Sequence, residues 1–294
     1  SRAMERTAER IGIGTAWAAS MLLVLGLAAL MGVLVVRGGS ALGPRLFFGD
    51  APAWDALTGR APVLDGIWPA IVGTLVLVAL ASLIALVLGI ATGIYLAEQA
   101  PRRLRDGLNL AFDVLAGVPS VVMGLFGFSM ILLLRRTIAP DAGTGLLLSA
   151  VCISLLVLPY LIRTTQISLR ALPTEIRLLG PSLGLTHVQN LRHVLLPAAG
   201  RGILSGAVLA IARAAEDTAV IMLTGAVASC GLPSGLLENF EALPFRIYVI
   251  AAEYRSEAEL AQGFGCALVL FVLTAGLLAL AWRLQRGMER RWSR

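Results

Sequence analysis

The amino-acid sequence predicts an all-α integral membrane protein with six membrane-spanning helices. Hydrophobic residues make up 57% of the 294-residue chain and charged residues only 14%, a composition that soluble domains do not show. Runs of about 20 apolar residues, each long enough to cross the hydrocarbon core of a bilayer, recur along the chain. Because these runs lack the polar–apolar alternation of a membrane β-barrel, we expect the spans to be helices.

The six expected helices form a single transmembrane domain over residues 1–294. Their bounds are predicted at about 11–36, 67–97, 110–134, 146–163, 198–228 and 264–282. The apolar part of the first segment is longer than that of a signal peptide, so we expect a retained helix. The longer connections are expected to be outer loops at 37–66 and 229–263 and a cytoplasmic loop at about 164–197.

The distribution of charge predicts the orientation of the chain in the membrane. All 24 basic residues are arginine, and the absence of lysine excludes a P-loop for ATP hydrolysis. With both termini in the cytoplasm, most of the arginines lie on the cytoplasmic side, as the positive-inside rule requires. The basic excess therefore indicates membrane topology and contact with lipids, and no nucleic-acid partner is expected.

No catalytic, metal or cofactor site is expected in the chain. The cysteines, Cys152, Cys230 and Cys266, are odd in number and scattered, which argues against a disulfide framework or a metal cluster. The two histidines, His187 and His193, are six residues apart and do not share a helix face. A Gly-x-Ser-x-Gly elbow and a histidine within a span are also absent.

The outer loops combine acidic residues with prolines and aromatic residues. Two interpretations remain open for them: an ordinary solvated surface, or a folded surface that meets a partner protein. The aromatic residues that favour the second interpretation are Phe240, Phe245, Tyr248 and Tyr254.

The connection from Leu172 to Gly202 predicts two short amphipathic helices in the cytoplasm. Pro173 suits a first helical turn and Gly184 suits the end of that helix, while Thr186 and Gln189 have the spacing of a capping box for the next helix. Leucines at 178, 179 and 183 would be exposed on the first helix, so a partner is expected to cover them.

The fifth predicted span carries three charges near its middle: Arg213, Glu216 and Asp217. A charge at the bilayer centre costs roughly 2.5 to 3.5 kcal/mol on insertion scales, so these groups need partners or a polar path. On a continuous helix Arg213 and Asp217 lie one turn apart, on a face shared with two glycines, Val220 and Thr224.

Two interpretations of these charges remain open. In the first, Arg213 forms an internal ion pair with Asp217 or Glu216 that only neutralises the charges. In the second, the Arg213 guanidinium binds oxyanions along a translocation route while a carboxylate holds it in place. Thr218 and Ser120, which follows Pro119 in the third span, are weaker candidates for the same route.

The cytoplasmic connection resembles the signature loop of ABC importer permeases in the frame Gly184, Val194, Leu196 and Pro197. In that family the loop is a coupling helix seated in a groove of the ATPase subunit. The resemblance implies ATPase contacts for Glu175, Arg177, Leu179, Gly180, Leu183 and Gly184. Leu178, Leu179 and Gly180 stand where the family has Glu-Ala-Ala, and Pro181 lies inside the expected helix.

Within that family the chain is similar to the PstA-type phosphate permeases over roughly residues 65–290. The segments "IVGTLVLVALASLIALVLGIATGIYLAEQAP", "LAGVPSVVMGLFGF" and "ARAAEDTAVIMLTG" carry this resemblance. By it, Arg213 matches an intramembrane arginine of the family and Asp217 matches a glutamate, whereas Glu216 replaces a glycine.

The resemblance implies a permease subunit that moves inorganic phosphate by alternating access, in a bacterial cytoplasmic (inner) membrane. It also implies a second, similar permease in a heterodimer, two ATP-binding subunits that hydrolyse ATP, and an extracytoplasmic phosphate-binding protein. Alternatives are a permease for sulfate, molybdate or a phosphonate, and an autonomous carrier in which Asp217 or Glu216 takes up a proton.

Overall fold

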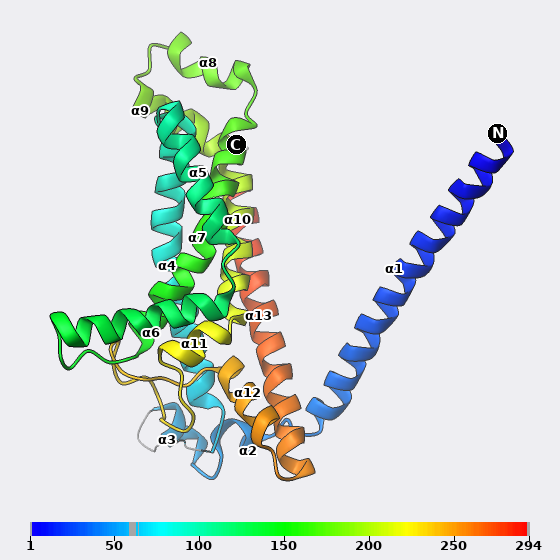
Figure 1. Ribbon diagram of the computed structural model, residues 1–294, viewed down its shortest axis with the longest axis vertical. Coiled ribbons are helices and arrows are strands. Elements are labelled where there is room, and N and C mark those ends of the chain that lie inside the picture. The colour runs from blue at the N-terminus through cyan, green and yellow to red at the C-terminus, as the bar shows by residue number, and fades with distance from the viewer. Residues whose placement is uncertain (1, 59–62, 64, 293–294) are drawn as a thin grey trace.

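The computed structural model describes residues 2–58, 63 and 65–292, and the described residues form helices joined by loops (Figure 1). Residues 1, 59–62, 64 and 293–294 of the predicted domain, including part of the outer loop 37–66, lie outside the described residues. The elements are α1 (Arg2–Gly39), α2 (Pro44–Phe48), α3 (Ala53–Leu57), α4 (Trp68–Glu98), α5 (Arg102–Ala116), α6 (Ser120–Thr137), α7 (Leu146–Arg170), α8 (Thr174–Ser182), α9 (His187–Asn190), the π-helical turn η1 (Leu191–Leu195), α10 (Leu196–Glu216), α11 (Ala219–Thr224), α12 (Leu243–Glu253) and α13 (Glu257–Trp292).

Six helical segments in the described part of the chain are long and apolar enough to cross a membrane, which confirms the predicted fold class. They are Gly12–Gly39, Trp68–Glu98, Ser120–Thr137, Leu146–Arg170, His187–Glu216 and Glu257–Gly287. The fourth runs beyond its predicted end at residue 163. Thr164 and Ser168 bond their hydroxyls to the carbonyls of Tyr160 and Thr164, so these polar residues are compatible with a continuing helix.

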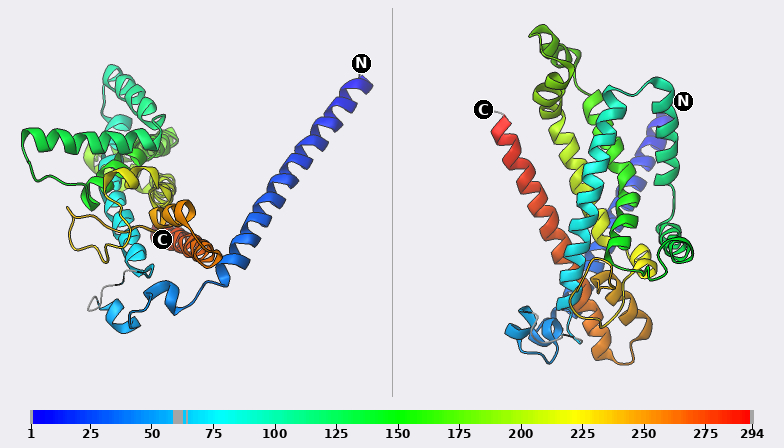
Figure 2. Two further views of the ribbon diagram at one scale, coloured as in Figure 1. Left: turned by 60° about the horizontal axis from the view of Figure 1, so that its bottom comes forward. Right: turned by 90° about the vertical axis from the view of Figure 1, so that its left-hand side faces the viewer.

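The centre of the molecule is a bundle in which α4 packs along α7 and α10 packs against both (Figures 1 and 2). Small and aliphatic buried side chains fill it, among them Ala81, Ile153 and Ala210. A Cβ atom added at Gly206 of α10 would lie 2.1 Å from the Thr164 hydroxyl oxygen of α7. Glycine at this position therefore permits the close approach of the two helices.

The prediction of one helix over 110–134 is wrong. That segment forms parts of two helices, α5 and α6, which are separated at Gly117–Pro119. Pro119 has no backbone N–H, and its ring disfavours helical geometry at Val118, so the helix ends before it. After the break α6 runs across the bundle instead of along it (Figures 1 and 2).

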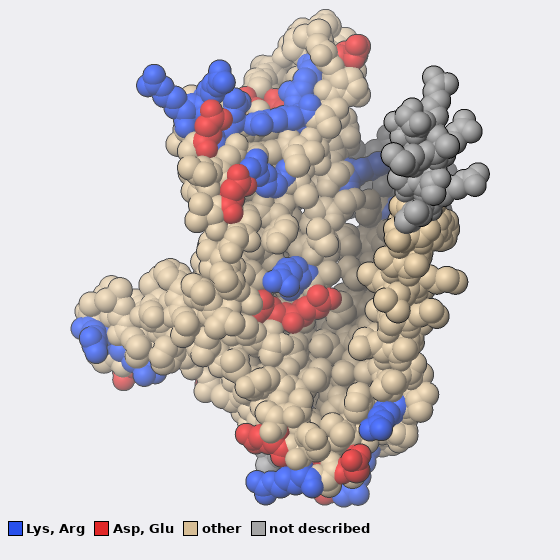
Figure 3. All heavy atoms as spheres, turned by 45° about the vertical axis from the view of Figure 1, so that its right-hand side comes forward, with Lys and Arg blue, Asp and Glu red and all other residues tan. Residues whose placement is uncertain are grey.

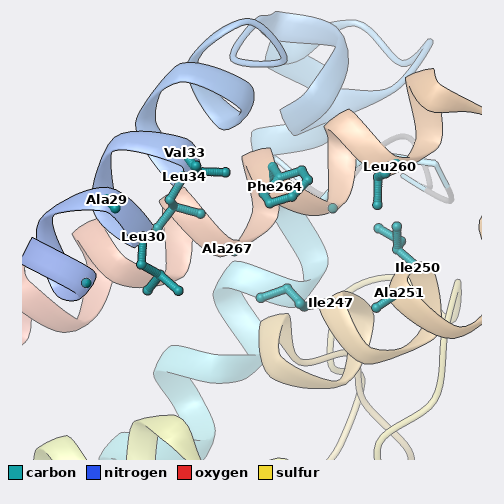
Figure 4. Close-up of a pocket in the computed structure, with 12 residues that line it drawn as sticks. Ala29, Leu30, Val33, Leu34, Ile247, Ile250, Ala251, Leu260, Phe264 and Ala267 are labelled. Atoms are coloured by element: carbon teal, nitrogen blue, oxygen red, sulfur yellow. The ribbon is translucent and has the colours of Figure 1, made fainter. Parts of the chain in front are cut away.

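Helix α1 diverges from the bundle, and only the C-terminal part of α1 lies close to the bundle, where it contacts α13 (Figure 2). A cavity of about 630 Å³ lies between α1, α12 and α13. Figure 4 shows Leu30 and Leu34 of α1, Ile247 and Ile250 of α12, and Phe264 of α13 around it. Because its lining is apolar, this cavity offers no donors for an oxyanion.

The connection between α11 and α13 is folded against the N-terminal end of α4. The Thr74 hydroxyl accepts the N–H of Leu243 at 2.9 Å and donates to the Ala70 carbonyl at 2.7 Å. Glu241, which is 1% exposed, pairs with Arg246 at 3.1 Å. Burial raises the pKa of this carboxyl, and the Gly231 N–H and Arg246 act in the opposite direction. These contacts fix the connection between α11 and α13 to the bundle.

We predict that Thr74→Val destabilises the protein by about 1–3 kcal/mol, because the buried Leu243 N–H loses its acceptor. Thermal unfolding in detergent measures this effect. Thr137→Val is the matched control, since the exposed Thr137 hydroxyl bonds only to the Leu133 carbonyl one turn away. Equal melting temperatures for Thr74→Val and the control would contradict the role of Thr74.

Candidate functional site

The fifth predicted span is interrupted at its charged residues. Helix α10 ends at Glu216, Asp217 has an extended backbone (φ −77°, ψ 114°), and α11 begins at Ala219. Oδ1 of Asp217 accepts the N–H of Val220 at 2.9 Å, and Asp217 is only 6% exposed. The carboxylate therefore satisfies one of the free N–H groups at the start of α11.

The prediction that 198–228 is one continuous helix is therefore wrong, and so is the shared face derived from it. Arg213 lies in the last turn of α10, whereas Val220 and Thr224 belong to a separate short helix. The change of direction at Asp217 turns its carboxylate toward α11 and into the protein. Asp217 acts as a cap in this structure, a role that apolar periodicity does not reveal.

Arg213 and Glu216 both remain exposed on the surface of the chain. Within the described residues, no ion pair involves Arg213, Glu216 or Asp217. The internal ion pair is thus not formed here. Figure 3 shows a small group of basic and acidic side chains at mid-height, with uncharged surface directly around it.

The two weaker candidates lie at the two helix breaks. Thr218 is half-buried between α10 and α11, and Ser120 is half-buried at the first residue of α6. Helix α6 packs against α11, so the elements that follow the two breaks are in contact. No polar contact joins the Thr218 or Ser120 side chain to Arg213 within the described residues.

The connection that is predicted to be cytoplasmic contains α8, α9 and η1, at the end of the bundle opposite α12 (Figure 1). The capping box of Thr186 and Gln189 is present at the start of α9, as predicted. Gly184 has φ +72° and follows the end of α8. Leu179 and Leu183 are 51% and 75% exposed, so these two side chains are available to a partner.

Two of the predicted ATPase-contact residues instead face the rest of the chain. Arg177 bonds through Nη1 to both carboxylate oxygens of Glu98 at 3.1 Å and through Nη2 to the Leu169 carbonyl at 2.6 Å. Gly180 is buried, and a Cβ there would lie 2.1 Å from Oδ1 of Asn190. Arg177 therefore fastens α8 to the ends of α4 and α7, whereas Glu175 is exposed.

The sequence alone did not indicate the side-chain pairs that join α5 to α7 and α8 to α4. Asp113 of α5 forms a bidentate pair with Arg163 of α7 at 2.5–2.6 Å, and Gln166 donates to Asn109 at 3.0 Å. Glu98 is likewise the partner of Arg177. Each pair joins residues that are 50 or more positions apart, so no local spacing could have indicated it.

We predict that Asp217→Ala costs about 1 kcal/mol of stability, because it removes the acceptor for the Val220 N–H. Asp217→Asn keeps a side-chain oxygen at that position and is expected to retain most of the stability. Thermal unfolding of both variants in detergent makes the comparison. An equal, large loss in both variants would indicate that the charge of Asp217, and not its capping oxygen, is what stabilises the break.

Comparison with known proteins places this architecture in a family. Residues 89–294 match the family described as binding-protein-dependent transport system inner membrane component. The phosphate transport system permease protein PstA 2 of Mycobacterium bovis is 31% identical over 229 residues, 77% of this chain and 74% of the relative. PstA 1 of Mycobacterium tuberculosis is 34% identical over 215 residues, 71% and 67% of the two chains. PstC of Mesorhizobium japonicum is 30% identical over 227 residues, 66% and 68%.

Among solved structures, a chain of the inward-facing MetNI methionine ABC transporter has a similar fold. The TM-score is 0.57 at 17% identity, and the match covers 81% of this chain and 99% of the other. The chain is therefore a multi-pass transport component of the inner membrane and is not itself an enzyme, as predicted. It belongs to the family of binding-protein-dependent transport system inner membrane components.

Proposed function

We propose that the chain is a permease subunit of an ATP-driven importer of inorganic phosphate. The observation that carries this proposal is the exposed Arg213 beside a helix break, in a chain 31–34% identical to phosphate permeases over most of its length. Arginine presents a planar fork of N–H donors with a permanent charge, which suits the oxygens of phosphate.

The break at Asp217 leaves the charge of Arg213 available to the substrate. Since Asp217 faces α11 and caps it, this carboxylate does not neutralise the guanidinium through a direct ion pair. Non-helical backbone at membrane depth is tolerated where it is buried in protein or lines a hydrated path. The proposed route of phosphate therefore passes Arg213, with Thr218 and Ser120 as further candidates at the breaks.

ATP-driven displacement of α8, at the end of the bundle assigned to the cytoplasm, is proposed to open and close this route. The exposed Leu179 of α8 and Leu183 directly after it are the proposed contact with an ATP-binding subunit, and Glu175 and Gly184 border them. Arg177 and Gly180 hold α8 against the bundle, so a displacement of α8 is passed to α4, α7 and, through η1, to α10. This arrangement is suited to alternating access driven by ATP.

The proposed assembly contains two ATP-binding subunits, a second permease in a heterodimer, and an extracytoplasmic phosphate-binding protein. Both termini are assigned to the cytoplasm, on the side of α8, by the arginine distribution. The folded segment around α12 is on the opposite side and is the proposed surface for the binding protein.

Uptake of radiolabelled phosphate into vesicles that carry all of these subunits tests the proposal. We expect uptake to require ATP and to be unaffected by excess sulfate. Uptake driven by a proton gradient without ATP would contradict the ATP-driven mechanism. Uptake abolished by sulfate, molybdate or a phosphonate would assign a different oxyanion to the route.

We predict that Arg213→Ala lowers ATP-dependent phosphate uptake by about tenfold or more, because the route loses its fixed positive charge. Arg136→Ala is the control, since Arg136 is an exposed arginine at the end of α6. Both complexes should contain the ATP-binding subunits in normal amounts. Wild-type uptake by Arg213→Ala would remove this residue from the proposed route.

We predict that Leu183→Asp reduces copurification of the ATP-binding subunit severalfold, because it places a charge on the proposed apolar contact. Leu110→Asp on α5 is the matched control, with 67% exposure at a position away from α8. Pull-down from detergent extracts gives the measurement. Equal recovery from both variants would place the ATPase contact elsewhere.

A further inference from the structure

The apolar cavity between α1, α12 and α13 has no part in the proposed route of phosphate. Its volume of about 630 Å³ lies within the range of roughly 300–1,000 Å³ that is typical of ligand-binding cavities. Apart from the Phe264 ring, its lining side chains are aliphatic, and they come from all three helices (Figure 4). An empty space of this size would cost its lining many van der Waals contacts, so an occupant is favoured.

Water does not suit this cavity, whereas a hydrocarbon chain does. An ordered water in a protein needs roughly two to four polar partners, and the lining residues that the structure describes have no polar side chain. Two of the walls, α1 and α13, are long and apolar enough to cross a membrane, and the chain belongs to an inner-membrane family. The apolar molecules next to the cavity are therefore the acyl chains of lipids.

Arg37 places a positive charge at the edge of the cavity. It is in the last turn of α1, one turn after Val33, which lines the cavity. Its guanidinium carbon Cζ lies 5.8 Å from the centre of the ring of Phe264, another lining residue, in a cation–π contact. The Arg37 side chain is exposed, and within the described residues no ion pair involves it. Its fork of N–H donors is therefore open to the oxygens of a phosphate group.

We propose that this cavity binds a membrane phospholipid, with an acyl chain between α1, α12 and α13 and the phosphate group at Arg37. The apolar lining recognises the chain, and the guanidinium recognises the anionic group that all glycerophospholipids share. The lipid fills the space between α1 and the bundle, since the most apolar part of the Gly12–Gly39 span has no buried residue of its own. This binding site does not depend on which substrate the permease moves.

Photolabelling of the assembled complex in lipid nanodiscs tests the proposal. The probe is a phosphatidylcholine with a diazirine midway along its palmitoyl chain, and peptide mass spectrometry locates the adducts after illumination. Helix α12 supplies the readout, because it lines the cavity but is not one of the described segments that could cross a membrane. We expect adducts on Ile247, Ile250 or Ala251. The absence of adducts on α12, which is the result expected where a helix of another subunit fills the cavity, would overturn the proposal.

Two glycines of α1 provide a matched pair of variants. A Cβ atom at Gly26, which lines the cavity, or at Gly32, which does not, would meet no atom within 4 Å. Gly26→Phe places its ring in the cavity and should lower the α12 adducts severalfold, whereas Gly32→Phe should leave them unchanged. Ala29→Leu, a smaller addition to the same wall, should also lower them, so the test does not depend on the assembly of one variant. Equal labelling in the lining variants and in Gly32→Phe would contradict an acyl chain in the cavity.

Arg37→Gln tests the recognition of the phosphate group. The same photoreactive chain is supplied either as phosphatidylcholine or as a diacylglycerol, which has no phosphate. We expect Arg37→Gln to lower α12 labelling by phosphatidylcholine severalfold and to leave labelling by the diacylglycerol unchanged. Arg136→Gln, at an exposed arginine of α6, is the control and should change neither. An equal effect of Arg37→Gln on both probes, or no effect on either, would overturn the contact between Arg37 and the phosphate.

Discussion

The hydrogen bond from the Val220 N–H to the Asp217 carboxylate is the interaction on which the arrangement of the site depends. A helix that stops inside a membrane exposes backbone groups that lipid cannot satisfy. Asp217 satisfies one of these groups at the break, so α10 can end at Glu216 and α11 can turn to pack against α6. As a consequence, Arg213 lies at the end of a helix, with its guanidinium exposed and outside any ion pair of the described residues.

A second set of contacts determines how the end of the bundle that carries α8 is held. Arg177 connects α8 to the carboxylate of Glu98 and to the Leu169 carbonyl, while Asn190 packs over Gly180. These contacts join the short helices to the ends of α4 and α7, and α10 begins directly after η1. The exposed leucines are therefore linked to the charged helix break through η1 and the length of α10.

The sequence was sufficient for the features that depend on composition and local spacing. Apolar length predicted the six spans, and the Thr186–Gln189 spacing predicted the cap of α9. The interruption at Asp217 was missed because the apolar run continues on both sides of it, and periodicity does not show where a side chain replaces a helical hydrogen bond. The roles of Arg177 and Gly180 depend on Glu98 and Asn190, and the positions of these partners follow from tertiary packing.

The central claim is that Arg213 borders a hydrated route for phosphate, and the most direct test is the accessibility of position 213 in the assembled complex. Cysteine would be placed there after replacement of Cys152, Cys230 and Cys266 by serine or alanine. The account predicts modification by a charged, water-soluble thiol reagent and slower modification when phosphate is being transported. Modification by membrane-permeant reagents alone, at a rate that phosphate and ATP do not change, would contradict it.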